Sequence, residues 1–361
     1  MTRRGWLHGL AAVPAALGAQ VQRPRIVVEE VTLRLKHTWT TTMSSSDERR
    51  NVFLRHTRDG ITGIGEGAPI VRYGENAYQA RDAAESLIST LGHENPLAYV
   101  DYLREAFRRL TGQYAARAAI DISTMDWVGQ KHGIPLYRLF GLDPAKAPIT
   151  TFSIGIDKPE VVRQKVREAE VFPVLKIKVG LDNDEETIGA VRAETDKPLR
   201  VDANEGWKDK ETALRKIRWL ESQGVEIVEQ PMPAEMIEET RWLRGRVNIP
   251  LMADEACRSI TDIPKLAEAY DAVNVKLSKS GGMCEAYKML QLARSYGMKT
   301  MIGCMIESSV GITAAAHVSP LTDWADLDGN LLIANDPYRG VTVENGKLVL
   351  PEGPGLGVRP A

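Results

Sequence analysis

The sequence lacks the features that mark membrane proteins, disulfide-stabilised domains and nucleic-acid-binding proteins. No stretch approaches the roughly 20 uninterrupted apolar residues that a membrane-spanning helix needs, so we expect no membrane partner. The cysteines, Cys257, Cys284 and Cys304, are odd in number and form no C-x-x-C pair, which argues against a disulfide or zinc framework. The net charge is only −2 and the charged residues are scattered, so nucleic acid is not expected as a partner.

The N-terminal residues have the order of an export signal. Arg3 and Arg4 are followed by Trp6 and by a weakly apolar run over residues 10–17, with small residues behind it. This order is typical of secretory signals, and the paired arginines resemble the twin-arginine signal for the export of folded proteins. We therefore predict that residues 1–24 direct the protein to the periplasm, and leave open whether they are cleaved. The alternative is a basic tail on a cytoplasmic protein.

Residues 25–145 are expected to form an N-terminal capping domain of the α+β class. Residues 25–35 alternate in polarity and residues 51–57 are rich in β-forming side chains, so both are predicted strands. Residues 76–140 then show helical patterns, including an Ala-rich run over residues 115–128 without proline. Strands that are followed by helices, and do not alternate with them, indicate a segregated α+β domain.

A glycine-rich segment lies inside this domain, at Gly60, Gly63, Gly65 and Gly67. A dinucleotide-binding loop would need a helix directly after the glycines, and Pro69 with its β-like flanks argues against one. The segment is therefore predicted to be a turn and a strand.

From about residue 150, short β-branched runs alternate with amphipathic helices. The two recur eight times at a spacing of about 25 residues, which favours an α/β fold of the (β/α)₈, modified TIM-barrel type over an open sheet. The barrel is predicted over residues 146–340 and carries the catalytic site. Residues 341–361 find no place in it, and we expect them to return to the capping domain. The eight predicted strands are Thr151–Ile156, Val174–Val179, Leu199–Ala203, Ile227–Glu229, Leu251–Ala253, Ala272–Leu277, Thr300–Cys304 and Trp324–Leu327.

Three carboxylates end consecutive strands of the predicted barrel. Asp202 ends the third strand, Glu229 the fourth, and Asp254 follows the fifth. Because active sites of barrels lie at the carboxyl ends of the strands, these side chains are expected to converge. Without a cation they would repel one another and raise one another's pKa, whereas all-oxygen ligation suits Mg²⁺. The trio is therefore the predicted metal site.

Two lysines are predicted to face each other across the barrel mouth. Lys178 ends the second strand and Lys276 the sixth, four positions apart in a ring of eight. A substrate between them would present opposite faces of one carbon, so one amine can remove a proton while the other returns one. Mg²⁺ would stabilise the enolate, and Mg²⁺ and Lys176 would both lower the pKa of Lys178. This predicts a two-base 1,1-proton transfer that inverts an α-carbon. Which lysine serves which epimer stays open.

These motifs make the chain similar to the enolase superfamily, in its muconate-lactonizing-enzyme subgroup. The resemblance covers nearly everything after residue 25 and implies a capping domain, a modified barrel, two catalytic lysines and three Mg²⁺ ligands. The predicted seventh strand and the residues after it, Thr300–Glu307, contain no histidine, which disfavours the mandelate-racemase subgroup. The motifs that carry the resemblance are Lys176-Ile-Lys178, Val201-Asp202-Ala-Asn204, Val228-Glu229-Gln-Pro231, Ala253-Asp254-Glu255 and Asn274-Val-Lys276-Leu-Ser-Lys-Ser-Gly281-Gly282.

The eighth predicted strand ends in Asp326-Leu-Asp328, which resembles the dipeptide epimerases, among them the L-Ala-D/L-Glu epimerases. The resemblance implies that Asp326 and Asp328 bind the ammonium group of a dipeptide, and two carboxylates opposite the metal would favour such a cation. Lys176 is taken as a third substrate-binding residue. A periplasmic location would bring the enzyme close to murein peptides. Which side chains the dipeptide carries is not readable from the sequence.

Other functions stay open at this point. The same lysines serve o-succinylbenzoate synthases, N-succinylamino-acid racemases and cycloisomerases, which need no ammonium-binding pair. A non-catalytic periplasmic binding protein could also retain the metal site. Association into a homo-oligomer is also left open.

A segment of the capping domain, over residues 36–50, is expected to close over the barrel mouth as a loop. Lys36, His37, Arg49 and Arg50 either recognise a terminal carboxylate of the substrate or face solvent, and the sequence does not decide between the two.

Overall fold

The computed structural model describes residues 24–361, so the motif at Arg3 and Arg4 lies outside the described residues. The larger part of the chain is built around a sheet of eight parallel strands, which are hydrogen-bonded in the order of the sequence. Each strand overlaps one of the eight predicted ranges, so the predicted barrel is confirmed. The strands are β4 (Phe152–Ile154), β5 (Leu175–Lys178), β6 (Leu199–Asp202), β7 (Val225–Glu229), β8 (Leu251–Ala253), β9 (Ala272–Lys276), β10 (Lys299–Gly303) and β11 (Trp324–Asp326).

The strands form an almost closed barrel. Between the first and the last strand, the backbone N–H of Thr151 donates to the carbonyl oxygen of Ala325 at 3.3 Å, and Thr150 pairs with Ala325 in an isolated parallel bridge. The ring places β5 and β9 four positions apart, on opposite sides. The carboxyl ends of all eight strands therefore surround one opening.

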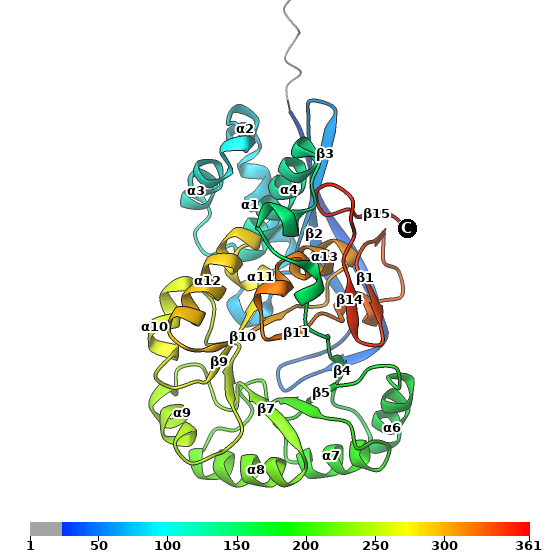
Figure 1. Ribbon diagram of the computed structural model, residues 1–361, viewed down its shortest axis with the longest axis vertical. Coiled ribbons are helices and arrows are strands. Elements are labelled where there is room, and N and C mark those ends of the chain that lie inside the picture. Colours follow the sequence, from blue (N-terminus) through cyan, green and yellow to red (C-terminus); the bar gives the residue numbers. More distant parts are fainter. Residues whose placement is uncertain (1–23) are drawn as a thin grey trace, which may run out of the picture.

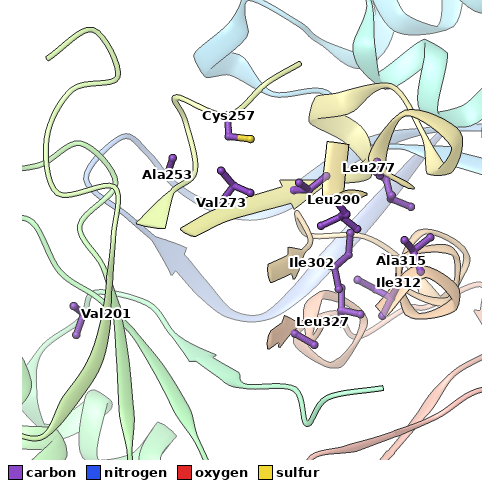
Figure 2. Packing of buried hydrophobic residues seen from close by; sticks show 14 of the residues in the cluster. Val201, Ala253, Cys257, Val273, Leu277, Leu290, Ile302, Ile312, Ala315 and Leu327 are labelled. Carbon is purple, nitrogen blue, oxygen red and sulfur yellow. The ribbon is translucent and has the colours of Figure 1, made fainter. Parts of the chain in front are cut away.

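Helices alternate with the strands and cover the outside of the barrel, with α6 to α9 along the lower edge of Figure 1. Figure 2 shows part of the packing: Val273 and Ile302 on the strands, and Leu290 and Ile312 on the helices, belong to one buried apolar cluster. Burial of this apolar surface is the main force that holds the helices to the barrel. The helices are α6 (Pro159–Glu168), α7 (Asp184–Arg192), α8 (Lys210–Ser222), α9 (Ile237–Arg244), α10 (Ile263–Leu266), α11 (Leu277–Ser280), α12 (Met283–Ser295) and α13 (Ser309–Val318).

Inside the barrel, the character of the side chains changes along the strands. Ile227, Met252, Ala272 and Met301 form a buried apolar layer, with Trp324 packed against it. Two residues further along four of these five strands, the side chain is acidic or an amide. Since alternate residues of a strand share a face, the polar side chains point into the barrel above the apolar layer. The apolar layer thus fills the barrel toward the amino ends of the strands, and the polar groups gather at the carboxyl ends.

The N-terminal part is an antiparallel sheet covered by helices, as predicted. Strands β1 (Arg25–Thr40), β2 (Ser45–Arg58) and β3 (Ile61–Gly67) form the sheet. The blue β1–β2 hairpin in Figure 1 runs from this sheet to the barrel, so the expected loop over residues 36–50 is instead paired strand on both sides of a short turn. The helices are α1 (Ala77–Ser86), α2 (Ile88–His93), α3 (Tyr99–Arg109), α4 (Tyr114–His132) and α5 (Leu136–Leu139).

The glycine-rich segment is a turn followed by strand β3, which confirms its prediction. Gly63, Gly65 and Gly67 lie against helix α4. A Cβ atom at any of them would come within 1.9 to 2.1 Å of a backbone oxygen of that helix. Side chains are excluded at this contact, so the strand and the helix pack backbone to backbone.

The segment over residues 341–361 contacts both parts of the molecule. Strands β13 (Thr342–Glu344) and β14 (Lys347–Val349) form a hairpin, and Lys347 bridges to Ile149 just before the barrel. Further on, the backbone N–H of Leu356 donates to Oδ1 of Asp126 on α4 at 2.7 Å. The short strands β12 (Tyr338–Arg339) and β15 (Arg359–Pro360) pair with each other. None of the helices within residues 24–361 combines the length and apolar character that crossing a membrane would take.

Candidate active site

Three buried carboxylates meet at the carboxyl end of the barrel. Asp202, Glu229 and Asp254 each offer an oxygen, and these oxygens lie within 4.8 Å of one another. The structure thus brings the three predicted metal ligands together. Burial and the neighbouring charge of Asp202 raise the pKa of Glu229 to about 7. So close a group of buried carboxylates needs compensating positive charge.

Lysines surround this trio. The Nζ of Lys178 lies 2.6 Å from Oδ2 of Asp202, and the Nζ of Lys276 lies 2.8 Å from Oδ2 of Asp254. Lys176 lies between them, with its Nζ 2.6 Å from Oε2 of Glu229. Burial lowers the pKa of Lys276 and Asp254 raises it, with a net result above the ordinary value. The expected lowering of the pKa of Lys178 stays a prediction.

The donor atoms at this site fit Mg²⁺. All three carboxylates are buried, and oxygen is the ligand that Mg²⁺ prefers. Two further buried oxygens, Oδ1 of Asn204 and Oε2 of Glu255, lack a hydrogen-bond partner within the part of the chain that the structure describes. Their neighbouring atoms Nδ2 of Asn204 and Oε1 of Glu255 join in a hydrogen bond of 2.9 Å. A buried set of acceptors with spare capacity is what a hard cation requires.

The lysines and part of the trio line a cavity of about 470 Å³ between the barrel and the N-terminal part. Lys178, on β5, and Lys276, on β9, come from opposite sides of the ring. Both are mostly buried, and each exposes less than a tenth of its surface. The cavity wall also contains Trp39, Thr41, Met43, Arg49, Asn51, Arg72, Tyr73, Ser153, Lys176, Asn204, Asp254, Glu255, Lys279, Met305, Ile306, Asp326, Asp328, Gly329 and Leu332.

The two aspartates after β11 differ in their partners. Oδ2 of Asp326 lies 2.7 Å from the Nζ of Lys176, and its Oδ1 accepts a hydrogen bond from Thr151 Oγ1 at 2.6 Å. Oδ2 of Asp328 accepts from the backbone N–H of Ser153 at 2.5 Å and has no cationic partner within residues 24–361. Burial and the charge of Asp326 accordingly raise the pKa of Asp328 to about 7. Asp328 is therefore the carboxylate with a place for a cation.

The β1–β2 hairpin covers one side of the cavity. Oγ1 of Thr42, in its turn, donates to the carbonyl oxygen of Asn204 at 2.7 Å. The Nζ of Lys178 lies 6.0 Å from the centre of the Trp39 ring. The hairpin thus contacts the loop that follows β6 and places an aromatic ring beside one of the lysines.

The four basic side chains over residues 36–50 lie in different places. Lys36 and His37 line a second hollow, beside helix α6, where His37 Nε2 lies 3.0 Å from Oε2 of Glu168. Arg49 lines the active-site cavity. Arg50 is exposed. Only Arg49 of the four belongs to the active-site wall.

Sequence reasoning gave no role to two residues that the structure places in the site. The Nζ of Lys279 contacts Oδ1 of Asp254 and lies 2.6 Å from its carbonyl oxygen. Nδ2 of Asn274 donates to Oε1 of Glu229 at 2.7 Å. Asn274 precedes Lys276 by two residues and so shares its face of β9, a signal that period-two reasoning would have found. Lys279 lies on the short helix α11, which the sequence did not predict.

Comparisons with known proteins agree with this geometry. Residues 24–141 match the family described as mandelate racemase / muconate lactonizing enzyme, N-terminal domain, and residues 160–361 match the enolase C-terminal domain-like family. The chain is 42% identical to L-Ala-D/L-Glu epimerase of Bacteroides thetaiotaomicron, over 90% of this chain and 85% of that protein. It is 45% identical to L-Ala-D/L-amino acid epimerase of Pedosphaera parvula, over 91% and 97% of the two chains. A solved structure, the dipeptide epimerase of Enterococcus faecalis with Mg and L-Leu-L-Tyr, superposes with a TM-score of 0.87 at 33% identity, covering 94% of this chain and 99% of that one.

Proposed function

Because the chain belongs to the mandelate racemase / muconate lactonizing enzyme family, we infer that it is a Mg²⁺-dependent dipeptide epimerase. The observation that carries the inference is the pair Asp326 and Asp328, in the same cavity as Asp254 of the carboxylate trio and the two opposed lysines. A dipeptide has a carboxylate at one end and an ammonium group at the other. The cavity offers a matching site for each. Residues 25–145 act as the cap and residues 146–340 as the catalytic barrel.

Asp202, Glu229 and Asp254 would hold the metal. Mg²⁺ supplies positive charge that stabilises the negative charge that develops on the substrate carboxylate when the α-proton leaves. Lys176, which contacts Asp202, Glu229 and Asp326, adds a fixed positive charge beside these carboxylates. The terminal carboxylate of the substrate would bind the metal held by the trio, which positions the substrate.

The two lysines carry out the proton transfers. The Nζ of Lys178 on β5 and that of Lys276 on β9 reach the cavity from opposite sides of the ring, so they address opposite faces of one α-carbon. One amine takes the proton, and the other, already protonated, gives a proton to the other face. The configuration at that carbon is thereby inverted, which makes the enzyme an isomerase.

The ammonium group of the dipeptide would bind at the aspartate pair. Asp326 is already paired with Lys176, whereas Asp328 has no cationic partner among the described residues. An ammonium group there would form charge-assisted hydrogen bonds and favour the ionised form of Asp328. N-succinyl amino acids carry no ammonium group, so they would form no such hydrogen bonds with Asp328.

Proton exchange in D₂O tests the function. The purified enzyme with Mg²⁺ is incubated with a set of dipeptides and with N-succinyl amino acids, and loss of the α-proton signal is followed by NMR. We expect exchange and epimerisation of dipeptides. Exchange of N-succinyl amino acids without any exchange of dipeptides would refute the substrate class, and binding without any exchange would indicate a non-catalytic binding protein.

We also propose a periplasmic location, where murein-derived dipeptides would be the substrates. The support is the Arg3-Arg4 motif, which belongs to the part of the chain outside the structure. Cell fractionation of the full chain and of the Arg3→Lys, Arg4→Lys variant tests it, because the variant should stay in the cytoplasm. The oligomeric state, which the sequence left open, is measured by light scattering on the purified enzyme.

A further inference from the structure

The active-site cavity contains a cation that no carboxylate neutralises. Among residues 24–361, Arg49 forms no ion pair, and the hydrogen bond found for its guanidinium runs from Nη1 to the backbone oxygen of Glu48 at 3.0 Å. The other basic side chains of the cavity wall are all in ion pairs: Arg72, Lys176, Lys178, Lys276 and Lys279. Within the described cavity wall, Arg49 is thus the basic side chain that has no carboxylate partner.

The strand fixes the direction of this side chain. Asn51, two residues further along β2, is buried and donates to the carbonyl oxygen of Ile306 at 2.9 Å. Because alternate residues of a strand share a face, Arg49 points to the same side, toward the residues that follow β10. Arg50, between them, points to the opposite face and is exposed. Burial lowers the pKa of Arg49, so the charge is held partly out of water without a partner.

The charges of a dipeptide account for every other ionic site in the cavity. Its terminal carboxylate would bind the metal held by the acidic trio, and its ammonium group would bind at Asp326 and Asp328. An anion left for Arg49 must therefore be carried by a side chain of the dipeptide. A guanidinium binds a carboxylate through two parallel hydrogen bonds, which an amide of the same shape cannot reproduce.

We propose that Arg49 makes this enzyme select dipeptides with an acidic side chain. The inference rests on the proposed function, because it assumes that the other two charges of a dipeptide are bound as described. It assigns a specificity residue to strand β2 of the cap, outside the barrel that carries the chemistry.

The test compares acidic dipeptides with their amide isosteres in the Mg²⁺-loaded enzyme. One arm uses L-Ala-L-Glu against L-Ala-L-Gln, and the other L-Glu-L-Ala against L-Gln-L-Ala, so the arms tell which position carries the acid. We expect kcat/KM for the acidic dipeptide of one arm to exceed that of its amide by about tenfold to a hundredfold. Arg49→Met, which keeps an apolar stem, should abolish the preference, and Arg49→Lys should retain part of it. Arg50→Met on the opposite face is the matched control and should keep the full preference.

Three outcomes would count against the proposal. Equal kcat/KM for acid and amide in both arms would show that the wild-type enzyme does not recognise the anion. An equal loss on acid and amide in Arg49→Met would show a structural role only, and circular dichroism on both methionine variants identifies a folding defect directly. Failure of all dipeptides to exchange would overturn the proposed function together with this inference, whereas exchange without acidic preference overturns the inference alone.

Discussion

The two lysines proposed as catalytic occupy equivalent places on opposite strands but have different neighbours. Lys178 lies 6.0 Å from the ring of Trp39 and contacts Asp202. Lys276 contacts Asp254, to which Lys279 is also bound. Asp202 is likewise shared, because the Nζ of Lys176 lies 3.2 Å from its Oδ2, so the aromatic ring beside Lys178 is what distinguishes the two surroundings. In the proposed mechanism, this ring makes the electrostatic surroundings of the two bases unequal.

Replacing either lysine should stop epimerisation. We expect Lys178→Ala and Lys276→Ala each to lower kcat by a factor of about 10² to 10⁴, because each removes a general acid or base. Each variant should still exchange the α-proton of one epimer, and the two should differ in which epimer that is. NMR in D₂O with each pure epimer measures both effects. Lys288→Ala, at an exposed lysine paired with Glu285, is the control, and full activity in either active-site variant would contradict the two-base mechanism.

The pH profile should report on Asp328, whose pKa is raised to about 7. The ionised carboxylate is the form that binds an ammonium group, so kcat/KM for a dipeptide should rise as the pH increases through about 7 and fall below it. In Asp328→Asn the rise of kcat/KM around pH 7 should disappear. Above about pH 8, kcat/KM of this variant should be about tenfold to a hundredfold lower than that of the wild type. If kcat/KM of the variant still rises around pH 7, the rise comes from the titration of another residue.

Single charged residues could be predicted because barrel sites lie at strand ends. Asp202, Glu229 and Asp254 each follow an apolar run of recognisable β character, and that position alone is enough to assign them to the barrel rim. Their partners could not be predicted in the same way. That Asp326 would be taken by Lys176 while Asp328 would not depends on side-chain positions across the barrel, on strands 150 residues apart in the sequence.

At the scale of elements, the β1–β2 hairpin was the least predictable part of the site. Residues 36–50 are rich in Thr, Ser and charged side chains, so their sequence has no apolar alternation to indicate strands. The register of β1 and β2 is irregular between Arg34 and Trp39, and the pairing then resumes next to the turn, with Trp39 opposite Ser46 and Thr40 opposite Ser45. Contact with the barrel stabilises these strands, for example through Thr42 and Asn204. Local preference was overridden by tertiary contacts.

The packing of β3 on α4 predicts a strong effect of one methyl group. A Cβ at position 65 would lie 2.0 Å from the carbonyl oxygen of Ala119. We expect Gly65→Ala to lower the free energy of unfolding by about 3 kcal/mol or more, because neither backbone can move without separating strand and helix. Urea-induced unfolding of the variant and of the wild type measures this difference in free energy. Gly92→Ala in helix α2, where a Cβ meets nothing within 4 Å, is the control and should change stability by no more than about 1 kcal/mol.

At the scale of the whole molecule, the sequence predicted the architecture well. Each of the eight barrel strands overlaps its predicted range because the alternation of buried strands and amphipathic helices is regular from residue 150 onward. Short elements without such periodicity were missed, for example α11, which has four residues. A single helical turn has no repeating pattern to detect, and only its neighbours in the fold determine it.

Removing the metal should affect stability as well as activity. Without Mg²⁺ the three carboxylates are balanced by lysines alone, so binding of the ion to the folded state adds stability. We expect EDTA to abolish epimerisation and to lower Tm, and Mg²⁺ at about 100 times its Kd to restore about 2.7 kcal/mol. Thermal unfolding with and without Mg²⁺ measures it. A Tm that does not respond to Mg²⁺ would contradict the assignment of the trio.

The hydrogen bond between Leu356 and Asp126 has a consequence for the order in which the protein can fold during synthesis. Helix α4 is made before any barrel strand, whereas Gly355 and Leu356, which pack on it, are made after all eight. Until Leu356 has been synthesised, Oδ1 of Asp126 lacks this hydrogen-bond donor, so the N-terminal domain of a ribosome-bound chain lacks one of its contacts. The last contacts of the first domain can thus be made only after all the strands of the second domain have been synthesised.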